Sequence, residues 1–139
     1  MKIAIINGPN LNMLGQREPQ IYGSQSFESY FETLQNSYGN HTLTYYQSNI
    51  EGELVTAIQT YGSTTEAIII NPAAYSHTSI AIADAIAAVP CKVVEVHISN
   101  IFAREEYRKH SYVSSRVSGV ITGLGLYGYN AAINYLQQP

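Results

Sequence analysis

Residues 15–23 of this 139-residue chain, GQREPQIYG, place an arginine and a tyrosine on a segment with glycine at both ends and proline inside. Glycine and proline both interrupt regular structure, so the segment predicts a mobile loop, a lid over about residues 15–24. A guanidinium beside a phenol favours the phenolate, which is the form that accepts a proton. Arg17 and Tyr22 therefore indicate a general base carried on this lid. With 12 tyrosines in the chain, a tyrosine that only packs the lid shut remains the alternative.

A second pair of chemical groups ends a predicted strand. His97 lies near the end of the run CKVVEVHIS, and Glu95, two residues earlier, points to the same face of that strand. A carboxylate beside an imidazole fixes the tautomer of the ring and suits it to general acid catalysis. The alternative is a buried core histidine with no catalytic role, whose hydrogen-bonding capacity is satisfied by the neighbouring carboxylate. An acid on a sheet facing a base on a lid is the arrangement needed for a β-elimination.

Apolar runs alternate with helix-like segments along the whole chain. The predicted strands are 2–7, 41–47, 67–71, 91–99 and 118–123, and the predicted helices are 26–37, 49–62, 76–88 and 129–137. Ser26 and Asn49 are the expected caps of the first two helices, and Gly62 is the expected end of the second. This alternation predicts an α/β protein of one domain over residues 1–139, with a flavodoxin-like doubly wound sheet of five parallel strands and helices on both faces.

In a doubly wound sheet, ligands bind beyond the carboxyl ends of the strands. These ends supply the segments 7–10, 71–77 and 97–100, which contain several asparagines and two histidines. Amides and hydroxyls suit a ligand with many hydroxyl groups, and backbone N–H groups at a helix start suit an anion. The histidines lack close spacing with carboxylate or thiolate ligands, so no metal site is expected.

The composition excludes several other classes of function. Charged residues make up only 12% of the chain, which favours a homo-oligomer whose copies cover one another; a neutral polar exterior is the alternative. The net charge of −3 and the absence of a basic run argue against nucleic-acid binding. No apolar run approaches the ~20 residues of a membrane span. The first residues lack the layout of a signal peptide and Cys91 is the single cysteine, so a cytoplasmic location is expected.

The segment GLGLYG at 123–128 matches the glycine pattern of dinucleotide-binding loops. The next strand and the acidic residue that would bind a ribose do not follow it in the sequence. We interpret these glycines as allowing the last helix to pack tightly on the sheet.

Five long blocks resemble the type II 3-dehydroquinases, in order and at that family's spacing. They are INGPNLNMLGQREPQIYG, QSNIEGEL, INPAAYSHTSIAIADA, VEVHISNIFAREEYRKHSY and GVITGLGLYGY. The resemblance covers essentially the whole chain and implies a flavodoxin-like homododecamer with a trimer as its building unit. It also implies reversible anti-elimination of water from 3-dehydroquinate to give 3-dehydroshikimate, without metal or cofactor, in the shikimate pathway or in quinate catabolism.

The resemblance assigns roles to individual residues. Tyr22 would remove the proton alpha to the ketone, with Arg17 activating it, and His97 would protonate the leaving hydroxyl group. Asn10 would hold a water that stabilises the enolate. Asp84 would reach into the site of a neighbouring subunit, and Arg104 would contact the lid. The full set of expected substrate-binding positions is Asn71, Ala73, His77, Asp84, Ile98, Ser99, Arg104 and Arg108.

Three positions depart from the family pattern. Ala73 stands where many members have glycine, so its methyl group could crowd the pocket. Phe102 replaces a common histidine, and residues 114–116 lack the usual proline, which we interpret as a loop variation. Two other functions stay open at this stage: a binding module of the same fold for a polyhydroxylated or phosphorylated ligand, and an enzyme that uses this acid–base pair on a different hydroxy-ketone.

Overall fold

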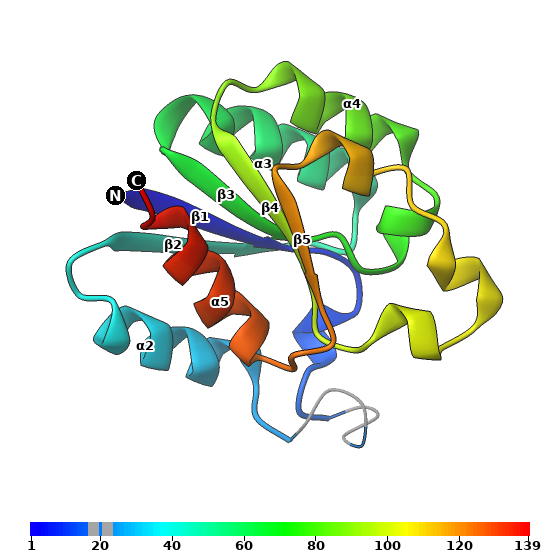
Figure 1. Ribbon diagram of the computed structural model, residues 1–139, viewed down its shortest axis with the longest axis horizontal. Helices are drawn as coiled ribbons and strands as arrows, with labels where there is room; N and C mark the ends of the chain where they lie inside the picture. The colour runs from blue at the N-terminus through cyan, green and yellow to red at the C-terminus, as the bar shows by residue number, and fades with distance from the viewer. Residues whose placement is uncertain (17–19, 21–23) are drawn as a thin grey trace.

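The computed structural model describes residues 1–16, 20 and 24–139, and these residues contain one five-stranded parallel sheet (Figure 1). The strands are β1 (Lys2–Asn7), β2 (Thr42–Gln47), β3 (Ala67–Asn71), β4 (Lys92–His97) and β5 (Gly119–Thr122). Their spatial order is β2-β1-β3-β4-β5, and every neighbouring pair is parallel. The order reverses between β1 and β3, as in flavodoxin-like sheets, so the predicted fold class is confirmed.

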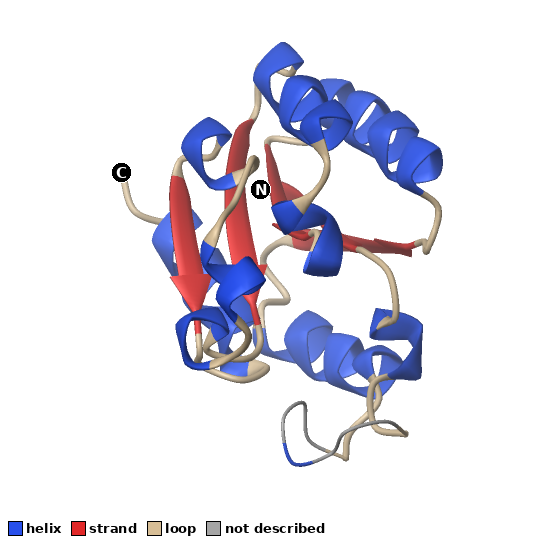
Figure 2. Ribbon diagram, turned by 90° about the vertical axis from the view of Figure 1, so that its right-hand side faces the viewer, coloured by secondary structure: helices blue, strands red, loops and turns tan. Residues whose placement is uncertain are grey.

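Helices cover both faces of the sheet (Figures 1 and 2). On one face lie α2 (Phe27–Ser37) and α5 (Tyr127–Leu136), and on the other lie α3 (Glu51–Thr64) and α4 (Ile80–Ala88). Successive residues of β1 enter different cores, because side chains alternate along a strand. Ile3 and Ile5 pack with α2 and α5, whereas Ala4 and Ile6 pack with α3 and α4. This double burial explains why the strands are apolar without interruption.

Short 3-10 helices form much of the remaining chain. They are η1 (Leu11–Met13), η2 (Ala73–His77), η3 (Ile101–Ala103), η4 (Glu106–Lys109) and η5 (Ser114–Arg116). The first four follow the carboxyl ends of β1, β3 and β4, and η5 precedes β5. Since parallel strands end at one edge, the polar residues that follow these strands are brought to the same side of the molecule.

The two expected helix caps have different outcomes. Ser26 caps α2 as predicted, because its hydroxyl accepts a hydrogen bond from the backbone N–H of Ser29. The prediction for Asn49 is wrong: Ile50 is the N-cap of α3, and the Asn49 side-chain oxygen accepts hydrogen bonds from other groups, including the backbone N–H of Asn10 at 3.0 Å. Asn49 thus ties the loop after β1 to the loop after β2.

The expected end of α3 at Gly62 is also wrong, since the helix continues to Thr64. Gly62 is buried, and a Cβ atom built on it would lie 2.4 Å from Cγ1 of Val89. The glycine therefore permits close approach of α3 to the end of α4, rather than stopping the helix.

The expected helix over 76–88 begins later than predicted. Ser79 is the N-cap of α4, and its hydroxyl accepts from the backbone N–H of Ile82 at 2.9 Å. The residues before Ser79 form η2, a tighter turn that directs Ser76 and His77 toward β4 and the segment before β5. The N-cap at Ser79 thus separates α4, a helix of the core, from η2, a turn that carries polar side chains.

The interpretation of the GLGLYG segment is confirmed at its last glycine. A Cβ atom on Gly128 would lie 3.0 Å from Cγ1 of Val96, so glycine permits the close packing of α5 on β4. Gly123 and Gly125 have φ angles of 88° and 62°, which shows that the turn itself also depends on glycine.

The close contact at Gly62 generates a stability prediction. We expect Gly62→Ala to lower the free energy of unfolding by about 1–3 kcal/mol, because the new methyl group overlaps the Val89 side chain. Urea denaturation measures this change. The matched control is Gly52→Ala in the same helix, where a Cβ meets nothing within 4 Å and where we expect a gain of up to about 1 kcal/mol. Equal effects of the two substitutions would contradict the packing role of Gly62.

Candidate functional site

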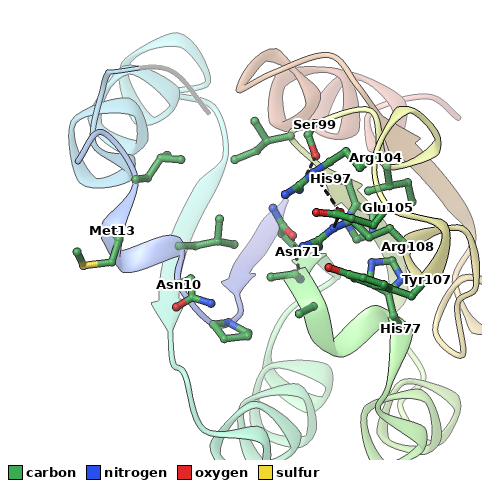
Figure 3. A pocket seen from close by; sticks show the side chains of 17 residues that line it. Asn10, Met13, Asn71, His77, His97, Ser99, Arg104, Glu105, Tyr107 and Arg108 are labelled. Atoms are coloured by element: carbon green, nitrogen blue, oxygen red, sulfur yellow. Dashed lines mark hydrogen bonds and ion pairs between the residues drawn. The ribbon is translucent and has the colours of Figure 1, made fainter. Parts of the chain in front are cut away.

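A pocket of about 330 Å³ lies at the carboxyl edge of the sheet, between the loop after β1 and the loops after β3 and β4 (Figure 3). Nine of the expected site residues line it: Asn10, Asn71, Ala73, His77, His97, Ile98, Ser99, Arg104 and Arg108. Leu11, Met13 and Leu14 add apolar side chains to the lining, and Met13 lies across the pocket from the histidines and arginines (Figure 3). The structure therefore brings together residues from three separate chain segments, those that follow β1, β3 and β4, as the strand-end rule predicts.

The predicted pair His97 and Glu95 is present at the end of β4. The imidazole Nε2 lies 3.4 Å from the carboxylate Oε1, and both side chains are almost completely buried. His97 lines the pocket and Glu95 does not, so the carboxylate lies behind the imidazole. Burial alone would raise the pKa of Glu95, but the contact with His97 and hydrogen bonds from two serine hydroxyls outweigh it and leave this pKa below its usual value. The pair therefore consists of an ionised carboxylate beside an imidazole that faces the pocket.

A second imidazole lies next to the first. The rings of His77 and His97 are stacked, with their centroids 6.2 Å apart and an angle of 21° between their planes. Nδ1–H of His77 donates to the backbone carbonyl of His110 at 2.7 Å, which fixes the orientation of the ring. Burial lowers the pKa of His77, and the nearby His97 and Arg108 lower it further. A neutral His77 then presents a polar, uncharged group to a ligand.

Asn71 is held by a residue that the sequence analysis did not find. Its side-chain N–H group donates to the hydroxyl of Tyr129 at 3.0 Å, and that hydroxyl donates to the side-chain oxygen of Asn7 at 2.8 Å. The other end of the Asn71 amide accepts from the backbone N–H of Ala73 at 3.1 Å. Burial raises the pKa of Tyr129, which keeps the phenol protonated. Tyr129 of α5 thus fixes which end of the Asn71 amide is donor and which is acceptor.

The cationic wall of the pocket is braced by neighbouring side chains. Nε–H of Arg108 donates to the Glu105 carboxylate at 2.5 Å, and this bond lowers the pKa of Glu105. Arg104 donates to the hydroxyl of Ser99 at 3.2 Å. Glu105 also lines the pocket, together with Tyr107. The two arginines are therefore held in place at the mouth of the pocket before a ligand arrives.

Two non-glycine residues of the pocket have left-handed backbone conformations. Asn10 has a φ of 71° and Ala73 a φ of 54°. Asparagine tolerates this region well, whereas alanine is strained there because of its Cβ atom. The departure noted at Ala73 thus falls on a position whose backbone favours glycine, and its methyl group is part of the pocket wall.

Not all expected site residues lie in the described pocket. Arg17 and Tyr22 lie outside the described residues. Asp84 is exposed on α4 and does not line the pocket, so a single chain gives it no role there. The sequence analysis missed Tyr129, whose only signal was an aromatic residue on the apolar stripe of the last helix. It also missed Ser76 and Ser114, which donate to Glu95, and Ser111, which lies within hydrogen-bond distance of both serines.

Metal-binding clusters and membrane-spanning helices are absent from the described part of the chain. Among residues 1–16, 20 and 24–139, no group of three or more histidine, cysteine, aspartate or glutamate side chains is placed to hold a metal ion. In the same residues, no helix is both long and apolar enough to cross a membrane.

The fold and pocket define a flavodoxin-like α/β protein with a histidine–carboxylate pair at a strand-end site for a small polar ligand. A family model described as "Dehydroquinase class II" matches residues 1–137. A 3-dehydroquinate dehydratase of Aliarcobacter butzleri is 52% identical over 140 residues, which cover 99% of this chain and 85% of that one. The chain belongs to the class II dehydroquinase family.

Other comparisons agree with this assignment. A catabolic 3-dehydroquinase of Emericella nidulans is 48% identical over 136 residues, covering 96% of this chain and 88% of that protein. The crystal structure of a type II dehydroquinase from Butyrivibrio crossotus superposes with a TM-score of 0.93 at 47% identity, covering 99% of this chain and 98% of that one.

The buried phenol generates a prediction about stability. We expect Tyr129→Phe to lower the free energy of unfolding by about 1–3 kcal/mol, because it leaves buried polar atoms of Asn7 and Asn71 without a partner. Chemical denaturation of the purified protein measures this. Tyr135→Phe is the control on the same helix, since Tyr135 is exposed, and we expect a change within about 0.5 kcal/mol. A Tyr129→Phe protein as stable as the control would show that the hydroxyl does not hold the two amides.

Proposed function

We propose that this chain removes water from 3-dehydroquinate to give 3-dehydroshikimate, reversibly and by anti-elimination through an enolate. Membership of the class II dehydroquinase family supports the overall reaction, because the relatives are named for it. The structural observation that carries the proposal is His97, which lines the pocket with a buried, ionised Glu95 3.4 Å behind it. The activity assigned is therefore that of a hydro-lyase.

The proposed first step is removal of a proton alpha to the substrate ketone. Tyr22 is the proposed base and Arg17 the group that favours its phenolate form, on the basis of their types and spacing in the sequence. The electrons of the broken C–H bond form an enolate. Asn10, which lines the pocket, is proposed to hold a water molecule that donates to the enolate oxygen.

The second step is loss of the hydroxyl group. His97 protonates the departing oxygen, the C–O bond breaks, and the enolate electrons form the carbon–carbon double bond of the product. A fixed negative charge behind the imidazole stabilises positive charge on the ring before this transfer. Water leaves and the product is a conjugated enone.

The other pocket residues are proposed to bind the polar groups of the substrate. A substrate with a carboxylate and several hydroxyl groups matches the mixture of amide, imidazole, hydroxyl and guanidinium groups on the wall. The proposed contacts are Asn71, Ala73, His77, Ile98, Ser99, Arg104 and Arg108. No cofactor is assigned to the reaction, since elimination of water changes no oxidation state overall.

A homododecamer built from trimers, in which Asp84 enters the pocket of a neighbouring copy, remains a proposal. It is supported by the low charged content of 12% and by the exposed position of Asp84 on α4. Sedimentation velocity of the purified protein should give a species of twelve chains. A stable monomer that is fully active would contradict the assignment of Asp84.

We place the enzyme in the cytoplasm, and the same chemistry serves either aromatic biosynthesis or quinate breakdown.

The reaction has a direct optical test. Mixing the protein with 3-dehydroquinate should raise the ultraviolet absorbance, because the product is a conjugated enone. We expect the same rate with and without a metal chelator. A folded sample that produces no rise in absorbance would contradict the proposed function.

Two substitutions test the roles of the acid and the base. We expect Tyr22→Phe and His97→Ala each to reduce kcat at least about 100-fold, since each removes a proton-transfer group, with binding of substrate largely retained. Tyr135→Phe, on the far end of α5, is the control and should keep full activity. Normal turnover by Tyr22→Phe would remove Tyr22 from the mechanism, and normal turnover by His97→Ala would remove His97.

A further inference from the structure

Both oxygens of the Glu95 carboxylate are occupied inside the protein. Oε1 accepts from the hydroxyl of Ser76 at 2.8 Å and Oε2 accepts from the hydroxyl of Ser114 at 2.6 Å. The two serines come from different places, one on η2 and the other on η5. Glu95 is therefore fixed from two sides by segments that are 38 residues apart in the sequence (114 minus 76).

A third serine joins these two. The hydroxyl oxygen of Ser111 lies 3.0 Å from that of Ser76 and 2.9 Å from that of Ser114. The same oxygen accepts from two backbone N–H groups, those of Val113 at 3.1 Å and Ser114 at 3.0 Å. A backbone bond from Tyr112 N–H to the Ser76 carbonyl, 3.0 Å long, holds the two segments together. We call Ser76, Ser111 and Ser114 the serine network.

Counting hydrogens shows which charge state the serine network fits. Each hydroxyl has one hydrogen to donate and two lone pairs to accept with. Both lone pairs of Ser111 are taken by backbone N–H groups, so Ser111 can only donate to its serine neighbours. The Ser114 hydrogen is within reach of both Ser111 and Glu95, and the carboxylate takes it because it is closer and charged.

The hydrogens of Ser76 and Ser114 therefore both go to Glu95. Both carboxylate oxygens thus accept serine hydrogen bonds, and an ionised carboxylate accepts such bonds more strongly than a protonated one.

The charged groups around Glu95 come from three elements. His97 of β4 is in contact with it, and His77 of η2 and Arg108 of η4 are electrostatically coupled to the same cluster. The strand neighbours of Glu95 in β3 and β5 are the apolar residues Ile70 and Val120. The contact with His97 and the hydrogen bonds from Ser114 and Ser76 together oppose the effect of burial, which agrees with the lowered pKa of Glu95.

We propose that the serine network is the positioning element of the acid in this reaction: it keeps Glu95 ionised and aligned behind His97, so that His97 holds the proton it transfers. The proposal rests on the proposed function, since it concerns the same dehydration. None of the three serines lines the pocket, so they act through Glu95 and His97 and do not touch substrate.

The experiment compares the pH dependence of turnover in three single variants. Ser114→Ala removes one donor to the carboxylate, so the pKa of Glu95 should rise and activity should be lost at a higher pH on acidification. We expect the ratio of the variant's kcat to that of the unmodified protein to fall as the pH is lowered, because protonation of the base Tyr22 affects both proteins alike and cancels in this ratio; KM should stay almost unchanged. Ser114→Thr keeps a hydroxyl and should restore the profile. Ser115→Ala, at the exposed neighbouring position, should behave as the unmodified protein.

A direct titration separates this inference from the proposed function. Carbon-13 NMR of the Glu95 carboxyl group measures its pKa without any turnover, and we expect a higher value in Ser114→Ala than in Ser115→Ala. If Ser114→Ala fails to fold, Ser76→Ala tests the other carboxylate oxygen in the same way. An unchanged Glu95 pKa in a folded variant, or a kcat ratio that does not fall as the pH is lowered, would overturn the inference. Absence of turnover in the unmodified protein would instead overturn the proposed function.

Discussion

The charge of Glu95 in the interior is the constraint on which the rest of the site depends. An ionised carboxylate that is fully buried loses its hydration, and the protein must replace that hydration with donors and a nearby positive partner. The alternating direction of side chains along β4 places His97 on the same face, two residues further on. The remaining donors cannot come from β4 itself, so they come from η2 and from the segment before β5. The same contacts therefore pack Glu95 in the interior, provide its hydrogen-bond donors and set the direction of the His97 imidazole.

Another part of the pocket, near the ends of β1 and β3, depends on neutral groups. Asn7 and Asn71 are the last residues of neighbouring strands in register with each other, and one phenol hydroxyl bridges their amides. The bridge fixes donor and acceptor directions without adding charge. The site therefore combines an ionic half near β4 with a neutral half near β1 and β3, which suits a substrate that is anionic at one group and hydroxylated at others.

The sequence predicts the fold because the strands are apolar along their whole length and alternate with capped helices. It also predicts the Glu95–His97 pair, because residues two positions apart on a strand point to the same face of the sheet. It does not predict which distant side chains contact one another behind the pocket. The pattern of residues 76–88 predicts one continuous helix, whereas Ser76 lies in η2 and Ser79 caps α4. Tyr129 has the pattern of an ordinary core residue, and only the distance to two asparagines shows its function.

Arg17 and Tyr22, the expected base and its activating group, lie outside the described residues. Asp84 is exposed on one chain, so its expected role concerns a surface shared with another copy. The strand-end rule predicts which distant segments meet at the pocket, but the sequence predicts neither the individual contacts behind the pocket nor the exact start and end of each helix.

The bridge made by Tyr129 has a consequence for how the protein folds. The phenol belongs to α5, while the amides that it orients belong to β1 and β3, which pair directly with each other. A chain in which β1 and β3 have paired but α5 has not yet docked still lacks the group that fixes Asn71. The Asn71 side of the pocket is consequently completed only when α5 packs on the sheet.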